Sequence, residues 1–272
     1  NLLPGAARDI VFPVFRHNAI NLRNSMNALF PAGSLSTERR FRMSLVAALI
    51  VLFWHSPAMG QSVKSDRHVQ GSTITFTLSN DKVEYTLVVD SNRVVSDKLA
   101  PQLSRSKQSG TGASAIETDA NFSLEVMWTD WQAPNKISNA DNPVVFTKSD
   151  FQIDTSEFTD PDAGARQLTL SLHGKDMPLL LKVVYRLDPK SFYVRRKVTL
   201  SDTSNAGHFL QHIAPIDADL NGKPSIVKSG GFGQPVAFRL GKIGGFFGLE
   251  YPTSDNSIMA GQPRPHVRCM EE

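Results

Sequence analysis

Residues 167–200 read QLTLSLHGKDMPLLLKVVYRLDPKSFYVRRKVTL. Three apolar segments, residues 167–172, 178–187 and 192–200, are separated by turn signals at Gly174 and at Asp188-Pro189. Short runs rich in Leu, Val and aromatic residues, bounded by glycine and proline, are typical of β-strands. The third run keeps charged residues among its valines, which predicts that one of its faces meets solvent. This stretch therefore predicts three consecutive strands.

The same pattern extends through most of the chain. Residues 72–78 (STITFTL) and 83–89 (VEYTLVV) alternate polar and apolar side chains on either side of Asn80-Asp81, which predicts a hairpin. Residues 122–128 (FSLEVMW) alternate again, whereas residues 132–143 are rich in Asn, Asp and Pro and predict a loop. Strands this closely spaced, with no amphipathic helix among them, favour an all-β fold. We expect a large two-sheet antiparallel supersandwich over residues 61–272.

A short apolar run near the N-terminal end has the features of an export signal. Residues 44–54 (SLVAALIVLFW) carry no charge, follow the basic residues 39–42, and precede the small residues Ala58 and Gly60. This order predicts a signal peptide over residues 43–60, starting at Met43 and cleaved before residue 61. This run of 11 uncharged residues is too short for a membrane span, which needs about 20 apolar residues.

The predicted signal peptide implies a location for the protein. We expect a periplasmic or secreted bacterial protein with no stable membrane insertion after cleavage. Residues 1–42 are then an upstream or disordered segment, and Met26 is a second candidate start.

Charge and cysteine content narrow the classes of partner. The whole chain has 29 basic and 26 acidic residues, of which residues 1–60 hold six and two, so residues 61–272 have 23 against 24 and a net charge of −1. A nearly neutral domain has no electrostatic attraction for nucleic acid. Cys269 is the only cysteine, so the domain has no internal disulfide and must fold by burying a large core.

The candidate binding residues lie at two expected strand ends. In the segment WTDWQAP (128–134), Trp131 and Asp130 follow a strand whose alternation places Trp128 in the core. An aromatic face that stacks on C–H groups, beside a carboxylate that accepts hydroxyl hydrogen bonds, suits a sugar. Glu250 and Tyr251 end a second apolar strand and are the other two candidates.

Several other patterns are weaker signals. The glycines of residues 230–233 lack the Lys-Ser/Thr and the βα unit of a phosphate loop, and they favour turns and bulges. His208 and His212 share a strand face but lie too far apart to chelate one ion unaided. Asp217 and Asp219 are two apart and are expected at a solvated strand end. We expect no metal and no cofactor.

Two segments carry a family resemblance. Residues 120–151 (ANFSLEVMWTDWQAPNKISNADNPVVFTKSDF) and 230–252 (GGFGQPVAFRLGKIGGFFGLEYP) resemble the N-terminal galactose-mutarotase-like β-sandwich of α-galactosidase-like (melibiase-type) bacterial glycoside hydrolases. The resemblance extends over roughly residues 70–260. It implies that a (β/α)₈ barrel follows the sandwich and supplies the two catalytic carboxylates. The catalytic residues would then lie outside this chain, which would stop before that domain and be inactive alone.

The resemblance also implies a partner and leaves two alternatives. The partner is a carbohydrate substrate, reached through the barrel, with Trp131 lining its pocket. One alternative is a periplasmic binding or assembly module of the kind found in membrane insertases, which would retain its first membrane helix. The other is an aldose-epimerase-like enzyme, which would need paired histidines and a glutamate in one cleft.

Overall fold

The computed structural model describes residues 8–13, 62–102, 115–130, 133–137, 143–203, 208–228, 230–249, 254–259 and 264–271. All of them belong to one compact unit, which spans residues 1–15 and 61–272. The predicted signal peptide, residues 43–60, lies outside the described residues. Within the described ranges, no helix is long and apolar enough to cross a membrane.

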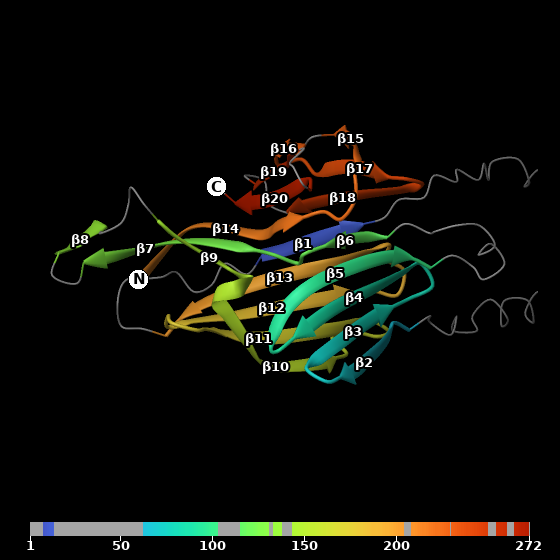
Figure 1. The fold of residues 1–272 in the computed structure, drawn as a ribbon, viewed down its shortest axis with the longest axis horizontal. Coiled ribbons are helices and arrows are strands. Elements are labelled where there is room, and N and C mark those ends of the chain that lie inside the picture. The colour runs from blue at the N-terminus through green and yellow to red at the C-terminus, as the bar shows by residue number, and fades with distance from the viewer. Residues whose placement is uncertain are drawn as a thin grey trace, which may run out of the picture. The chain divides into compact units, whose positions relative to one another are not determined.

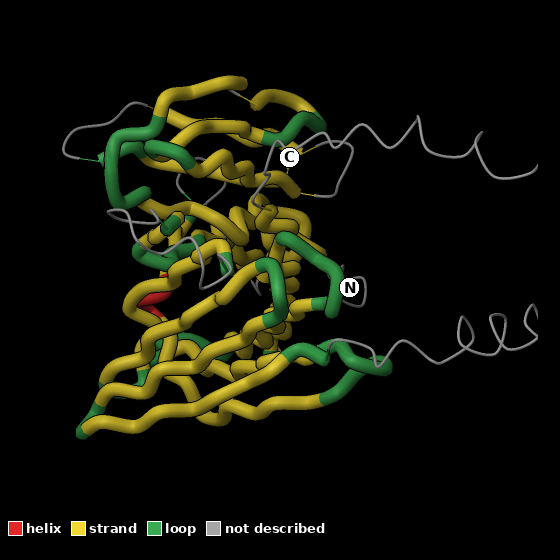
Figure 2. Tube along the Cα trace, turned by 90° about the vertical axis from the view of Figure 1, so that its right-hand side faces the viewer, coloured by secondary structure: helices red, strands yellow, loops and turns green. Residues whose placement is uncertain are grey.

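Nearly all regular structure in these ranges is β-strand, as Figure 2 shows, and every pairing between strands is antiparallel. The prediction of an all-β antiparallel fold is confirmed. The described strands pair into three sheets, where the sequence analysis expected two. A single turn of 3-10 helix, η2 (Lys148–Asp150), interrupts them.

The first sheet has eight strands in the order β10-β11-β12-β13-β1-β18-β17-β15. Their bounds are β10 (Phe151–Thr159), β11 (Arg166–Gly174), β12 (Leu179–Leu187), β13 (Tyr193–Asp202), β1 (Arg8–Pro13), β18 (Ile243–Leu249), β17 (Val236–Leu240) and β15 (Ser225–Lys228). The three strands predicted from residues 167–200 are β11, β12 and β13, and they pair consecutively.

The second sheet has seven strands in the order β16-β19-β20-β14-β7-β8, and β9 also pairs with β7. Their bounds are β16 (Gly230–Phe232), β19 (Ser254–Met259), β20 (His266–Glu271), β14 (His208–Asp219), β7 (Ser123–Asp130), β8 (Ala133–Ile137) and β9 (Val144–Thr147). The third sheet is a five-stranded meander of β2 (Lys64–Gln70), β3 (Thr73–Ser79), β4 (Val83–Asp90), β5 (Arg93–Pro101) and β6 (Ile116–Thr118).

The meander packs face to face against β10–β13, as Figure 1 shows. Aromatic contacts join the two layers: the ring centroids of Tyr85 and Tyr185 lie 5.4 Å apart, and those of Phe76 and Phe158 lie 5.9 Å apart. Alternate residues of β11 and β12, such as Leu168, are completely buried between them. Each such side chain contributes roughly 2 kcal/mol through loss of apolar surface from water.

One strand comes from the segment that the sequence analysis placed outside the domain. Residues 8–13 of the predicted upstream segment form β1, which lies between β13 and β18 (Figure 1, blue). The assignment of these six residues is therefore corrected; the remainder of residues 1–42 lies outside the described residues. Ile10 and Phe12 alternate with Asp9 and Val11, but six residues are too few for this alternation to be recognised as a strand pattern in the sequence.

The predicted loop at residues 132–143 also contains a strand. β8 pairs with the end of β7 through Thr129–Ile137 and Asp130–Ala133, with an irregular register between them. Its sequence, APNKI, has little strand propensity, so the pairing partner and not the local sequence selects this conformation.

Candidate functional site

A row of ionisable side chains crosses three adjacent strands of the second sheet. On β7, β14 and β20, apolar residues such as Leu124, Ala218 and Val267 face the core and are at most 2% exposed. The intervening positions point to the opposite face because side chains alternate along a strand. We call the six charged or titratable residues on that face the polar row: Glu125, His212, Asp217, Asp219, His266 and Arg268.

Strand register places the members of the polar row in facing pairs. Asp219 pairs with His266 and Asp217 with Arg268 across β14 and β20, and His212 pairs with Glu125 across β14 and β7. β14 is irregular on both sides, between Leu210 and His212 and between Ile213 and Ile216. Bulges of this kind redirect side chains and are frequent next to functional sites.

His266 is held between two carboxylates. Its Nε2 lies 2.6 Å from Asp217 Oδ1, and its Nδ1 lies 2.9 Å from Asp219 Oδ1. The hydrogen bond to Asp217, joined by that to Asp219, raises the pKa of His266 to about 9 against the opposing effect of burial. At neutral pH the imidazole is therefore protonated, and both ring nitrogens donate.

The two inner carboxylates are held in the ionised form. Burial alone would raise the pKa of Asp217, but the hydrogen bond and charge of His266, together with the charge of Arg268, lower it. Burial would likewise raise the pKa of Glu125, but its hydrogen bonds to His212 and Arg268 lower that pKa. Glu125 accepts at both oxygens: Oε2 lies 2.9 Å from His212 Nδ1, and Oε1 lies 2.7 Å from Arg268 Nη2.

These pKa values bear on the chemistry that the polar row can perform. General acid–base catalysis works best with groups whose pKa lies near the working pH. The pKa of His266 lies above neutrality, whereas those of Glu125 and Asp217 lie below their usual acidic values. His266, Glu125 and Asp217 are consequently fixed charges of opposite sign, suited to holding a polar ligand. Asp219, with 46% of its side chain exposed, is the most accessible of the ion-paired carboxylates in it.

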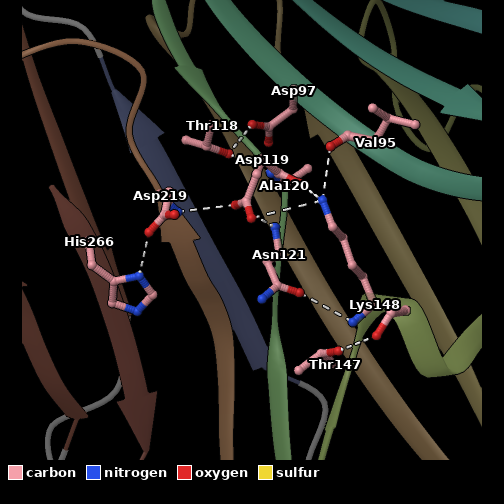
Figure 3. Close-up of polar contacts among 11 residues, drawn as sticks. Val95, Asp97, Thr118, Asp119, Ala120, Asn121, Thr147, Lys148, Asp219 and His266 are labelled. Atoms are coloured by element: carbon pink, nitrogen blue, oxygen red, sulfur yellow. Dashed lines mark hydrogen bonds and ion pairs between the residues drawn. The ribbon is translucent and has the colours of Figure 1, made fainter. Parts of the chain in front are cut away.

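A second group of polar contacts holds the polar row against the rest of the unit (Figure 3). The backbone N–H of Asp219 donates to Asp119 Oδ1 at 3.1 Å, and the N–H of Asp119 donates back to the Asp219 carbonyl at 3.2 Å. Lys148 donates through Nζ to the carbonyls of Asp119 and Val95, the latter at 2.9 Å. These bonds connect β14 to the β6–β7 connection, to β5 and to η2.

Next to the contacts of Asp119 and Lys148, the core contains a cluster of buried ionisable side chains. Asp97 is 3% exposed and accepts hydrogen bonds from Thr118 and from Tyr85 Oη, the latter at 3.1 Å. Burial raises the pKa of Asp97, although Thr118 and the buried Arg196 act in the opposite direction. The Arg196 guanidinium lies over the ring of Tyr185 at 5.5 Å. This cluster is closed to solvent, and we regard it as part of the core.

The four binding residues predicted from the sequence stay untested. Asp130 ends β7 and pairs with Ala133, but its side chain lies outside the described residues. Trp131, Glu250 and Tyr251 fall in undescribed gaps, the first after β7 and the other two after β18. β7 and β18 belong to different sheets, so strand pairing does not bring these residues together.

Sequence reasoning missed half of the polar row. It weighed His212, Asp217 and Asp219 separately and did not consider Glu125, His266 or Arg268. A signal was available in the segment HVRCME, where His266 and Arg268 alternate with the buried Val267 and Cys269. Asp217 and Asp219, which were expected at a solvated strand end, instead hold His266 between their carboxylates; we call this arrangement the clamp around His266.

Two general findings complete the description of the site. Among the described residues, no group of three or more His, Cys, Asp or Glu side chains could hold a metal ion. Comparison of the chain with protein-family models, with curated proteins and with solved structures finds no match.

Proposed function

We propose that this chain is the non-catalytic β-sandwich of a glycoside hydrolase and that it binds carbohydrate through the polar row. The observation that carries the proposal is the alternation of fixed acceptors and donors along the row: Glu125 beside Arg268, and Asp217 and Asp219 around His266. Neighbouring hydroxyls of a sugar each need a donor and an acceptor. Charged partners form the stronger hydrogen bonds.

The number of strands that the row crosses suggests how large a ligand it takes. The polar row crosses β7, β14 and β20, and neighbouring strands lie about 4.8 Å apart, so it extends over about 10 Å. A ligand that touches the whole row would therefore extend over more than one sugar ring. We propose an oligosaccharide as the ligand.

The binding experiment uses the full chain and a matched control. Asp219→Asn and His266→Gln should weaken binding of galacto-oligosaccharides at least tenfold, measured by calorimetry and by saturation-transfer NMR. His173→Gln is the control, because His173 Nδ1 pairs with Asp154 Oδ1 at 2.6 Å on the first sheet, away from the row. Equal loss in the control, or no binding by the wild type, would contradict the proposal.

The hydrolase context has its own test. The reading frame beyond codon 272 should encode a (β/α)₈ barrel with acidic residues at its strand ends. Purified residues 1–272 should not hydrolyse an aryl galactoside, because the family resemblance places the two catalytic carboxylates in the barrel. Turnover of that substrate by this chain would contradict the non-catalytic assignment.

One observation favours a second candidate, an aldose-epimerase-like enzyme. The polar row holds His212 beside Glu125 and carries His266 on the adjacent strand β20, and such an enzyme would need these residue types in one cleft. The raised pKa of His266 and the lowered pKa of Glu125 argue against proton transfer by this pair near neutrality. Accelerated interconversion of α- and β-galactose, followed by polarimetry and abolished by His266→Gln, would favour the enzyme.

A further inference from the structure

β1 links two parts of the first sheet. In the strand order, β13 lies on one side of it and β18 on the other. β1 pairs with β13 over six positions, from Arg8–Val198 to Pro13–Tyr193, and with β18 at Ile10–Leu249 and Val11–Gly248. Without residues 8–13, both neighbours would present backbone groups that β1 now pairs.

The register shows which positions of β1 lie on the core side of the sheet. Positions 8, 10 and 12 pair with Val198, Arg196 and Val194, which are 1%, 2% and 0% exposed. Position 10 also pairs with Leu249, which is 5% exposed. Residues that face each other across a pair share a face of the sheet. The groove therefore favours an extended peptide with apolar residues at positions 10 and 12, which are Ile10 and Phe12 in this chain, whereas the end position that pairs with Val198 holds Arg8.

The sequence separates β1 widely from both of its neighbours. Between Pro13 and Lys64, where β2 begins, lie the 50 residues 14–63, and Tyr193 follows Pro13 by 180 positions. So long a connection constrains the position of β1 only weakly. Sheet pairing and burial must hold the strand in place, as they do when a separate peptide adds to a sheet.

We propose that the space between β13 and β18 is a strand-acceptor groove, and that its occupant is this chain's own segment Arg8–Pro13, held by pairing and not by its covalent connection. The groove requires residues 8–13 to stay with the folded unit. A chain that starts at Met43, or one that is cleaved before residue 61 as the sequence pattern predicts, lacks β1 and leaves two open strand edges, which are sites for aggregation or for capture of another strand. The proposed groove therefore conflicts with removal of residues 8–13 by that cleavage. This inference is independent of carbohydrate binding.

The experiment cuts the connection and asks whether the strand remains. A specific protease site is inserted between residues 16 and 60 of the full chain, and the purified protein is cleaved under native conditions. We expect the N-terminal fragment to co-elute with the remainder in size-exclusion chromatography and to be found there by mass spectrometry. Separation of the two fragments would overturn the proposal.

A pair of variants tests the register. Ile10→Asp with Phe12→Asp places charges on the core side of β1 and should release the fragment after cleavage. Val11→Thr changes the opposite face and should leave it bound. Retention of the double variant at the wild-type level would overturn the proposed groove.

Hydrogen exchange gives a readout that does not depend on the stability of a variant. In the cleaved wild-type chain, amides of β13 and β18 should keep the protection that they have in the intact chain. Their protection should fall at least tenfold when the fragment is removed with denaturant and the remainder is refolded alone. Equal protection with and without the fragment would also overturn the proposal.

Discussion

The clamp around His266 predicts a specific pH dependence of stability. The pKa rises from 6.5 in the unfolded chain to about 9 in the fold, so the protonated ring stabilises the folded state. This stabilisation is complete below about pH 6.5 and is lost as the pH rises through about 9. The difference in pKa corresponds to about 3 kcal/mol. Asp219 is 46% exposed, so solvent screening reduces the expected effect to about 1–2 kcal/mol.

The assay compares the wild type with His266→Gln in urea at several pH values between 6 and 10. The free energy of unfolding of the wild type should exceed that of the variant by about 1–2 kcal/mol at pH 6, and the gap should close by pH 10. Because both proteins share all other titrating groups, the difference isolates His266. His173→Gln serves as the control, since His173 and Asp154 are more exposed, at 41% and 47%. A gap that is constant with pH, or that widens above pH 9, would refute the assigned clamp.

Three further predictions concern the core and its turns. Gly230→Ala should destabilise the fold by about 2 kcal/mol or more in urea, because Gly230 has a φ of +90° and an added Cβ would overlap the backbone oxygen of Asn256. Arg196→Met should cost about 3 kcal/mol, since it leaves the buried Asp97 without its cation, and adding Asp97→Asn should restore part of that loss. Cys269 should not react with a thiol reagent until urea unfolds the chain, because it is fully buried and burial raises its pKa; rapid reaction of the native protein would show this placement to be wrong.

The strands that the sequence predicted best are those with regular alternation and a buried face. β3 and β4 emerged as a hairpin from residues 72–78 and 83–89, and they pair in register from Thr73–Asp90 to Ser79–Glu84. β11 and β12 emerged for the same reason. In each case, the pattern of side chains along one strand contains the information on which face is buried.

The missed strands lack this local signal. β2 has the sequence KSDRHVQ and is largely exposed, as befits a polar edge strand. β5 carries Asp97 on its core side, where alternation predicts an apolar residue, and its pairing with β4 shifts between Val88 and Val89. Arg196 interrupts the inward face of β13 in the same way. Buried ionisable groups interrupt the alternation of apolar and polar residues. The fold tolerates them because partners on other strands compensate the cost of their burial.

Local periodicity therefore determined the antiparallel all-β class and the inward faces of the main strands, because the two-residue period is a property of each strand alone. The polar row depended on tertiary structure: Glu125 and Arg268 are 143 positions apart, and only the order β7-β14-β20 brings them to 2.7 Å. The place of β1 was likewise decided by pairing with residues some 180 positions away. Register between distant strands is set by the packing of the whole core, and no short segment of sequence encodes it.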